Sequence, residues 1–101
     1  KTLGRYDKNW APHHFDLIEL NEAFAVGIVA FMKAFKLDWK FVEERMNVLG
    51  GSIALGHPLG STGTRLLISL TTALRMRGLR FGAWGQCNGA GEAVMGSVAI
   101  E

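Results

Sequence analysis

Two side chains that could do chemistry stand in glycine-rich segments of this sequence. His57 lies between a glycine and a proline, in a segment that leads into a predicted helix, and the free N–H groups at a helix N-terminus favour anions. Cys87, the only cysteine, opens a turn that contains Gly89 and Gly91. A thiol near an imidazole can act as a nucleophile or carry a proton. A lone histidine or cysteine is more often structural, so neither residue decides the function by itself.

The sequence pattern excludes several familiar sites. The segment around His57 lacks the Gly-Lys-Ser/Thr of a Walker loop, and the chain has no Gly-x-Gly-x-x-Gly dinucleotide fingerprint. One cysteine is too few for an internal disulfide framework or the usual four-ligand zinc signatures. His13 and His14 are adjacent but have no third ligand nearby, so we expect an exposed pair and no metal site.

The composition is that of a globular protein. Of the 101 residues, 49% are hydrophobic and 20% are charged, which suits one folding unit or a piece of one. The formal net charge of +2 is too small to indicate a nucleic-acid or anionic-membrane partner. The longest apolar run, residues 23–32, is too short for a membrane span, and we expect no secretory signal. Most glycines fall in residues 50–96, where they predict built loops between apolar segments.

The beginning of the chain predicts a strand followed by a largely apolar helix. Residues 15–20 are short and rich in apolar side chains, as in a buried strand. Asn21 is expected to cap the next helix, with Glu22 in its first turn. In residues 23–35 apolar side chains cover nearly the whole circumference, which is typical of a helix covered on most sides. Such a helix needs more neighbours than this chain supplies.

The rest of the chain predicts two helices and a hairpin. Asp38 is expected to begin the first of these helices, and Gly78 is expected to end the second. In chain order the expected elements are a short helix (38–46), a glycine-rich loop (47–63), a helix (64–77) and two strands (79–86 and 93–100). This order predicts an α/β layered unit whose sheet ends in an antiparallel pair. Two covered helices and core strands in so short a chain indicate missing layers, so we expect a piece of a larger protein.

Three segments together resemble the C-terminal end of a thiolase, an acyl-CoA C-acyltransferase. Residues 21–25, NEAFA, are similar to the family's Asn-Glu-Ala-Phe motif. Residues 47–63, NVLGGSIALGHPLGSTG, match the family's long signature at every constrained position. Residues 87–91, CNGAG, resemble its third motif, a cysteine followed by alternating small residues. The resemblance covers residues 15–101, and residues 1–14 are expected to form a loop or linker.

The resemblance implies a thiolase-like layered α/β/α fold, of which the chain holds only the C-terminal portion, an incomplete mixed sheet with covering helices. It implies thiolysis of a 3-oxoacyl-CoA by CoA, or the reverse Claisen condensation of acetyl-CoA, and leaves the direction open. In that chemistry His57 donates a hydrogen bond to the thioester oxygen, and Asn21 positions a water that donates beside it. Cys87 acts as the general acid and base, and the Gly89 N–H helps to form a second oxyanion hole.

The same resemblance assigns Ala23 and Phe24 to the wall of the substrate pocket. The third motif also departs from the family's pattern, in ways that bear on acyl-chain preference more than on proton chemistry. The departures are at Trp84, Gln86, Ala90, Ala93 and Met95.

The resemblance also implies substrates and partners. CoA and acyl-CoA are the implied substrates, with no permanently bound cofactor and no metal. The family's nucleophilic cysteine lies in an N-terminal half that these 101 residues do not include, so we expect the isolated chain to be inactive. The intact protein is implied to be a homodimer or homotetramer, in the bacterial cytoplasm or, in a eukaryote, in the mitochondrial matrix.

Two alternatives remain beside the catalytic interpretation. The first is a noncatalytic, thiolase-derived module that associates with a partner through the apolar helix of residues 23–35. The second is a related condensing enzyme of the ketosynthase type. It is disfavoured because those enzymes generally use two histidines where this chain pairs Cys87 with His57.

Overall fold

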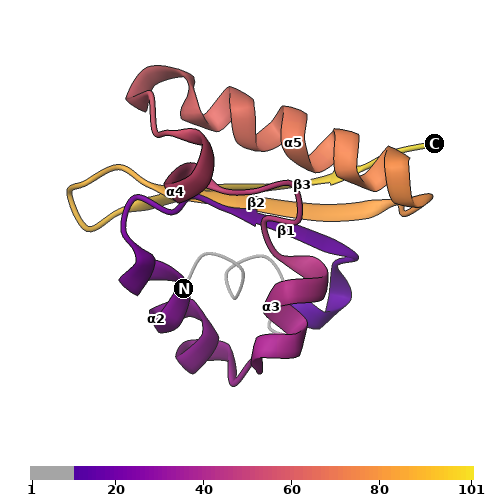
Figure 1. Ribbon diagram of the computed structural model, residues 1–101, viewed down its shortest axis with the longest axis horizontal. Helices are drawn as coiled ribbons and strands as arrows, with labels where there is room; N and C mark the ends of the chain where they lie inside the picture. Colours follow the sequence, from indigo (N-terminus) through magenta and orange to yellow (C-terminus); the bar gives the residue numbers. More distant parts are fainter. Residues whose placement is uncertain (1–10) are drawn as a thin grey trace.

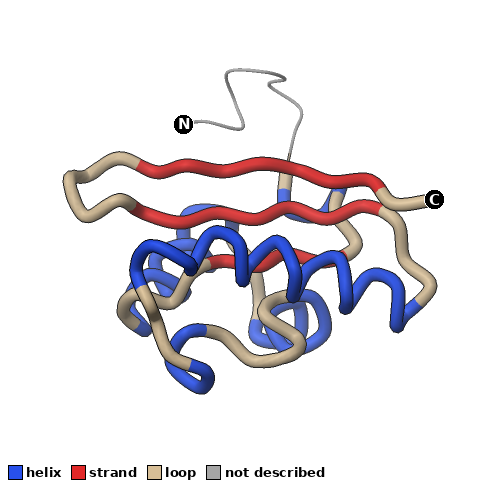
Figure 2. The backbone as a smooth tube through the Cα atoms, turned by 90° about the horizontal axis from the view of Figure 1, so that it is seen from above, coloured by secondary structure: helices blue, strands red, loops and turns tan. Residues whose placement is uncertain are grey.

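The computed structural model describes residues 11–101, in which a three-stranded sheet separates two layers of helices (Figure 1). The strands are β1 (Leu17–Leu20), β2 (Phe81–Cys87) and β3 (Ala93–Ala99), and they lie in that order across the sheet (Figure 2). β1 runs parallel to β2, whereas β2 and β3 form an antiparallel hairpin. The predicted α/β fold with an antiparallel end is therefore confirmed.

Helices cover both faces of this sheet. They are α2 (Ala25–Phe35), α3 (Trp39–Arg45), α4 (Ser52–Leu55) and α5 (Thr62–Arg77), with short 3-10 turns at η1 (Pro12–His14) and η2 (Leu59–Ser61). α5 runs along one face, with α4 on the same side, and α2 and α3 lie on the other face (Figure 1). The predicted loop or linker at residues 1–14 lies mostly outside the described residues, and its last part forms η1.

The parallel pairing of β1 with β2 joins segments that are far apart in the sequence. In the register, Leu17 lies beside Gly82. Asp16 fixes the start of this pairing, since its Oδ2 accepts the backbone N–H groups of Arg80 at 3.0 Å and Phe81 at 2.8 Å. Hydrogen bonds from these two N–H groups stabilise the carboxylate and lower the pKa of Asp16.

Alternate side chains of β1 belong to two separate apolar clusters. Leu17 is buried with Leu70 and other residues of α5 on one face of the sheet. Ile18 is buried on the opposite face with Met32 of α2 and Phe41 of α3. Because side chains of a strand point alternately to opposite faces, the short β1 supplies both layers of the core.

The start of α2 differs from the prediction. The helix begins at Ala25, and its N-cap position is Phe24, which makes no side-chain capping bond. Asn21 therefore does not cap α2, and Glu22 does not lie in its first turn. Both polar side chains instead form hydrogen bonds with the glycine-rich segment that follows α3.

Within the described residues, α2 is covered on one side only. Ile28 and Met32 are buried, but Phe24 is 76% exposed and Val26 is 70% exposed. Residues 11–101 therefore leave much of the apolar surface of this helix uncovered, as the sequence predicts.

The remaining elements follow the predicted order, with one correction. Asp38 begins α3 by accepting the backbone N–H of Phe41 at 2.8 Å, and Gly78 ends α5 in a left-handed conformation with φ of 65°. Residues 47–63, however, are not one loop. They contain α4 and η2, and α5 begins at Thr62, before the predicted start.

Replacing Gly82 with alanine is expected to lower the free energy of unfolding by about 1–3 kcal/mol. A Cβ at this position would lie 2.7 Å from Cδ1 of Leu70, a fully buried side chain. Urea denaturation measures the change. Gly27→Ala is the matched control, because a Cβ there meets nothing within 4 Å and the helix interior favours alanine by about 0.5–1 kcal/mol. Equal stability of Gly82→Ala and the unsubstituted chain would contradict this packing.

Candidate functional site

The three sequence motifs meet at one edge of the sheet. Asn21 directly follows β1, and its backbone N–H donates to the carbonyl oxygen of Gly85 in β2 at 2.8 Å. The first turn of α5 lies against the end of β2, since a Cβ added at Gly63 would be 3.4 Å from Nε2 of Gln86. β1 and β2 end at this same edge (Figure 1), and Cys87 is the last residue of β2. Parallel strands place their carboxyl ends together, which is where α/β sheets bind ligands.

Asn21 and His57 lie in contact at this edge. The Asn21 Nδ2 atom is 3.4 Å from Nε2 of His57, and the Asn21 side chain is buried. On its other side, the imidazole Nδ1 is 2.7 Å from Oγ1 of Thr62, which is fully buried at the start of α5. The imidazole is therefore held at both nitrogens, and its plane is fixed.

A second set of polar contacts holds Asn21 from behind. The Ser52 hydroxyl donates to Oδ1 of Asn21 at 2.5 Å, and Arg65 Nη2 donates to the Ser52 oxygen at 2.6 Å. Ser52 lies in α4 and Arg65 lies in α5, so this chain of contacts ties both helices to the end of β1.

Glu19 lies beneath this network, on the same side of the sheet as α5. The side chain is 1% exposed, and its Oε2 atom has no hydrogen-bond partner among the described residues. Burial raises the pKa of Glu19 to about 7, the charge of Arg65 opposes this shift, and the charge of Glu22 adds to it. A titratable carboxyl group is thus buried next to the candidate site.

Glu22 and Asn47 fasten the glycine-rich segment to β1. The Asn47 side chain bonds both backbone groups of Leu20, at 2.8 and 2.9 Å, and donates to Oε1 of Glu22 at 2.9 Å. The other Glu22 oxygen accepts the backbone N–H of Ile53 at 3.0 Å. A Cβ at Gly51 would overlap the Glu22 carboxylate, so a larger residue there would have to displace this carboxylate from its hydrogen bonds. The segment that carries His57 therefore starts from a fixed point.

The other predicted site residues lie at the same edge but are less enclosed. Cys87 is exposed at the end of β2, and Gly89 lies in the following turn with φ of 85°, a conformation that favours glycine. Asn88 orders this turn by donating to Oε2 of Glu92 at 2.6 Å. Of the two predicted pocket residues, Ala23 is half-buried and Phe24 is exposed.

Sequence reasoning missed four members of the network: Glu19, Ser52, Thr62 and Arg65. A charged residue within an otherwise apolar strand was the available signal for Glu19. No spacing rule links the other three to Asn21 or His57, because their contacts form only when α4 and α5 pack over the end of β1.

Other candidate features lie elsewhere or are absent from the described part of the chain. His13 and His14 are exposed as predicted, and residues 11–101 contain no group of three metal-ligating side chains. No helix in residues 11–101 is long and apolar enough to cross a membrane.

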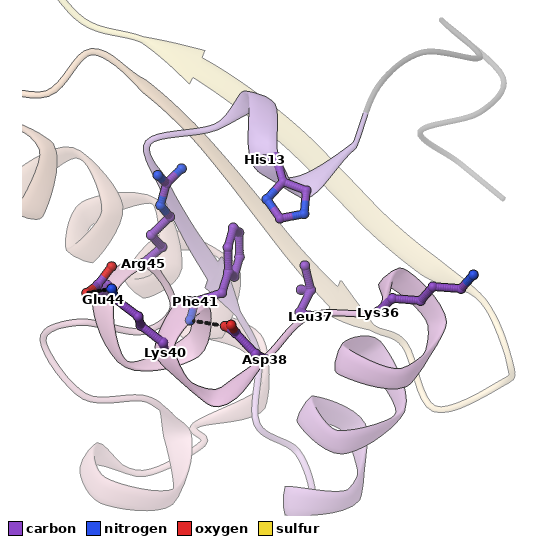
Figure 3. A pocket seen from close by; sticks show the side chains of 8 residues that line it. All are labelled: His13, Lys36, Leu37, Asp38, Lys40, Phe41, Glu44 and Arg45. Carbon is purple, nitrogen blue, oxygen red and sulfur yellow. Dashed lines mark hydrogen bonds and ion pairs between the residues drawn. The ribbon is translucent and has the colours of Figure 1, made fainter.

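An open pocket of about 260 Å³ lies beside α3 (Figure 3). It is lined by His13, Lys36, Leu37, Asp38, Lys40, Phe41, Glu44 and Arg45. Asp38 caps α3 there, and Lys40 and Glu44 form an exposed ion pair at 3.9 Å. None of the predicted catalytic residues lines this pocket, so it is separate from the candidate site.

Known proteins match this chain along most of its length. The family described as "Thiolase, C-terminal domain" matches residues 5–100. Acetyl-CoA acetyltransferase of Synechocystis is 41% identical over 101 residues, which are 100% of this chain and 24% of that relative. The 3-ketoacyl-CoA thiolase of Bacillus subtilis is 45% identical over 80 residues, which are 79% of this chain and 19% of that relative.

Solved structures share the fold as well. Human mitochondrial 3-ketoacyl-CoA thiolase in complex with CoA matches with a TM-score of 0.80 and 36% identity, covering 90% of this chain and 22% of that chain. Bacillus anthracis acetyl-CoA acetyltransferase gives a TM-score of 0.77 and 39% identity, with 91% and 23% covered. The fold is thus that of the C-terminal portion of these structures.

The chain belongs to the thiolase family. It spans less than a quarter of the length of the relatives named above.

Glu19→Gln is expected to change how stability depends on pH. Between pH 4.5 and about 7 the unfolded chain loses the Glu19 proton while the folded chain keeps it, so rising pH destabilises the unsubstituted chain. Glutamine removes this loss, which is about 1.4 kcal/mol for each unit of pKa difference. Urea denaturation across this range measures it, with Glu43→Gln on the exposed face of α3 as the control. A pH-independent difference between Glu19→Gln and the unsubstituted chain would contradict the buried, protonated carboxyl.

Proposed function

We propose that this chain supplies the oxyanion donors and the acid/base group of an acyl-CoA C-acyltransferase. The reaction is thiolysis of a 3-oxoacyl-CoA, or the reverse Claisen condensation of acetyl-CoA. The observation that carries the proposal is the contact of Asn21 with His57 at 3.4 Å, at the sheet edge where Cys87 ends β2. These residues belong to the three motifs that resemble thiolases.

Thiolysis requires donors at the thioester oxygen of the leaving group. When the bond between the α and β carbons breaks, its electron pair moves onto the thioester, and negative charge collects on that oxygen as an enolate. Preorganised hydrogen bonds stabilise such charge. His57 donates one from Nε2, while the Thr62 hydroxyl turns to donate to Nδ1. Asn21 positions a water that donates another.

Cys87 completes the proton transfers. Its thiol gives a proton to the α carbon of the enolate, which releases acetyl-CoA and leaves a thiolate. The thiolate then takes the proton of the incoming CoA thiol, whose sulfur attacks the acyl group held by the enzyme, and Cys87 returns to its first state. The Gly89 N–H donates to the carbonyl oxygen in that second step.

The acyl group is held by a nucleophilic cysteine from the N-terminal half of a complete thiolase. The 101-residue chain alone is therefore inactive. We also propose that the intact protein is a homodimer or homotetramer. Its substrates are CoA and acyl-CoA, and it needs no permanently bound cofactor. Ala23 and Phe24 line the substrate pocket, and the high exposure of Phe24 in this chain suits a residue that meets a ligand or the missing half. The bacterial cytoplasm is the proposed compartment, with the mitochondrial matrix as the eukaryotic alternative.

A chimera tests these roles directly. The 101 residues replace the matching C-terminal segment of the Synechocystis acetyl-CoA acetyltransferase, to which they align over their full length. The chimera is expected to cleave acetoacetyl-CoA with CoA. Cys87→Ala should lower kcat by about 100-fold or more, because proton transfer by a positioned group contributes at least that much. Ser97→Ala, on the exposed surface of β3, is the control and should keep full activity.

Two outcomes would contradict the proposal. If Cys87→Ala or His57→Ala left thiolysis unchanged, these residues would not have the assigned roles. If the chimera folded and assembled but lacked activity, the chain would instead act as a noncatalytic association module, with the exposed face of α2 as its contact surface.

A further inference from the structure

We propose that Ser52 and Arg65 are positioning residues that fix the orientation of the Asn21 side-chain amide, an inference that rests on the proposed function. They hold its oxygen away from His57 and its nitrogen toward His57. Neither residue touches the proposed position of the reacting atoms. They act through Asn21, by a chain of hydrogen bonds that begins at a group able only to donate.

The direction of each hydrogen bond in this chain is determined by Arg65. A guanidinium has donors and no acceptor, so Nη2 donates to the Ser52 oxygen at 2.6 Å. The Ser52 hydroxyl must then place its own proton elsewhere, and in residues 11–101 its acceptor is the Asn21 side chain, at 2.5 Å. The amide oxygen can accept this proton and the amide nitrogen cannot. The oxygen of Asn21 therefore faces Ser52.

The opposite end of the amide is fixed as a consequence. With Oδ1 at Ser52, Nδ2 lies 3.4 Å from Nε2 of His57 and donates to its lone pair. In the free chain the imidazole proton then lies on Nδ1, where it meets the Thr62 oxygen at 2.7 Å. Catalysis needs the proton on Nε2, so the imidazole must change to the other tautomer when substrate binds. Thr62 accommodates both tautomers, because a hydroxyl can both donate and accept.

A reversed amide would oppose catalysis. It would turn the partial negative charge of Oδ1 toward the place where the enolate oxygen develops charge, and it would remove a donor from that place. It would also accept the Nε2 proton of His57, which the thioester oxygen needs. Losing one oxyanion donor costs about 100- to 1000-fold in kcat in other enzymes. Ser52 and Arg65, together called the brace, exclude the reversed amide before substrate binds.

Burial and charge hold Arg65 in place. Its Nε and Nη1 atoms are buried without a hydrogen-bond partner among the described residues, and so is Oε2 of Glu19. The Glu19 carboxyl lies on the strand beneath α5 and interacts electrostatically with Arg65. Among the described residues, the hydrogen bond from Nη2 to Ser52 at 2.6 Å is the side-chain contact that orients the guanidinium.

The tautomer of His57 tests the proposal without any assay of activity. Long-range 1H–15N spectra of the 101-residue chain distinguish a protonated nitrogen from one with a lone pair. We expect the Nδ1–H form to dominate in the unsubstituted chain and the Nε2–H form to dominate in Ser52→Ala. Ser52→Thr keeps the hydroxyl and should restore the first form. Ser69→Ala, elsewhere on α5, is the control. The same tautomer in the unsubstituted chain and folded Ser52→Ala would overturn the proposal.

Arg65→Met provides a second variant, which keeps the proposal testable if Ser52→Ala does not fold. It removes the donor that directs the Ser52 proton, so it should also shift His57 toward Nε2–H. Arg75→Met, at an exposed position near the end of the same helix, is the matched control and should leave the tautomer unchanged. An unchanged tautomer in folded Arg65→Met would also contradict the brace.

Kinetics of the chimera separate this proposal from the function on which it rests. Ser52→Ala should lower kcat by about 10- to 100-fold and change KM for acetoacetyl-CoA by less than about threefold, because the lost contact acts in the transition state. Full activity of Ser52→Ala with inactive Asn21→Ala would overturn the brace and leave the proposed function standing. Full activity of Asn21→Ala would overturn the proposed function. The tautomer of His57, compared between the unsubstituted chain and Ser52→Ala, would still decide the orientation of the Asn21 amide.

Discussion

The parallel pairing of β1 with β2 is the constraint on which the site depends. A parallel pair requires a long crossover, and here that crossover carries α2, α3, α4 and α5 across both faces of the sheet. The pairing brings the carboxyl ends of both strands to one edge. Asn21 then lies at the end of one strand and Cys87 at the end of the other. Asp16 fixes the register that makes the two ends coincide.

The same arrangement explains why polar groups are buried beneath the site. β1 alternates between two apolar clusters, so Glu19 necessarily faces α5, where Arg65 is the nearby cation. Burying these polar groups costs stability, because Oε2 of Glu19 and two guanidinium nitrogens of Arg65 have no hydrogen-bond partner among the described residues. Its value here is directional, since the guanidinium supplies a donor that orders Ser52 and then Asn21. We propose that local stability is given up here to hold the Asn21 amide in one orientation.

Much of the fold was predictable from the sequence, because local signals determine it. Apolar patterning and caps predict β1, α3, α5 and the hairpin, and each of these is confirmed. Resemblance pointed to the motif residues, and the structure brings Asn21 and His57 into contact although they lie 36 positions apart. The role of Asn21 as a helix cap was wrong, because its partner Ser52 is 31 positions away and no local pattern records it. Long-range hydrogen bonds of this kind depend on packing that local patterns do not describe.

The central claim is that Asn21 and His57 act as one unit at the thioester oxygen. A double-mutant cycle in the chimera tests it most directly, with kcat measured for Asn21→Ala, His57→Ala and the double variant. Residues that act as a unit are strongly non-additive. The double variant is expected to be no more than about threefold slower than the slower single variant. Losses that multiply would contradict it, because they would show that the two side chains act independently.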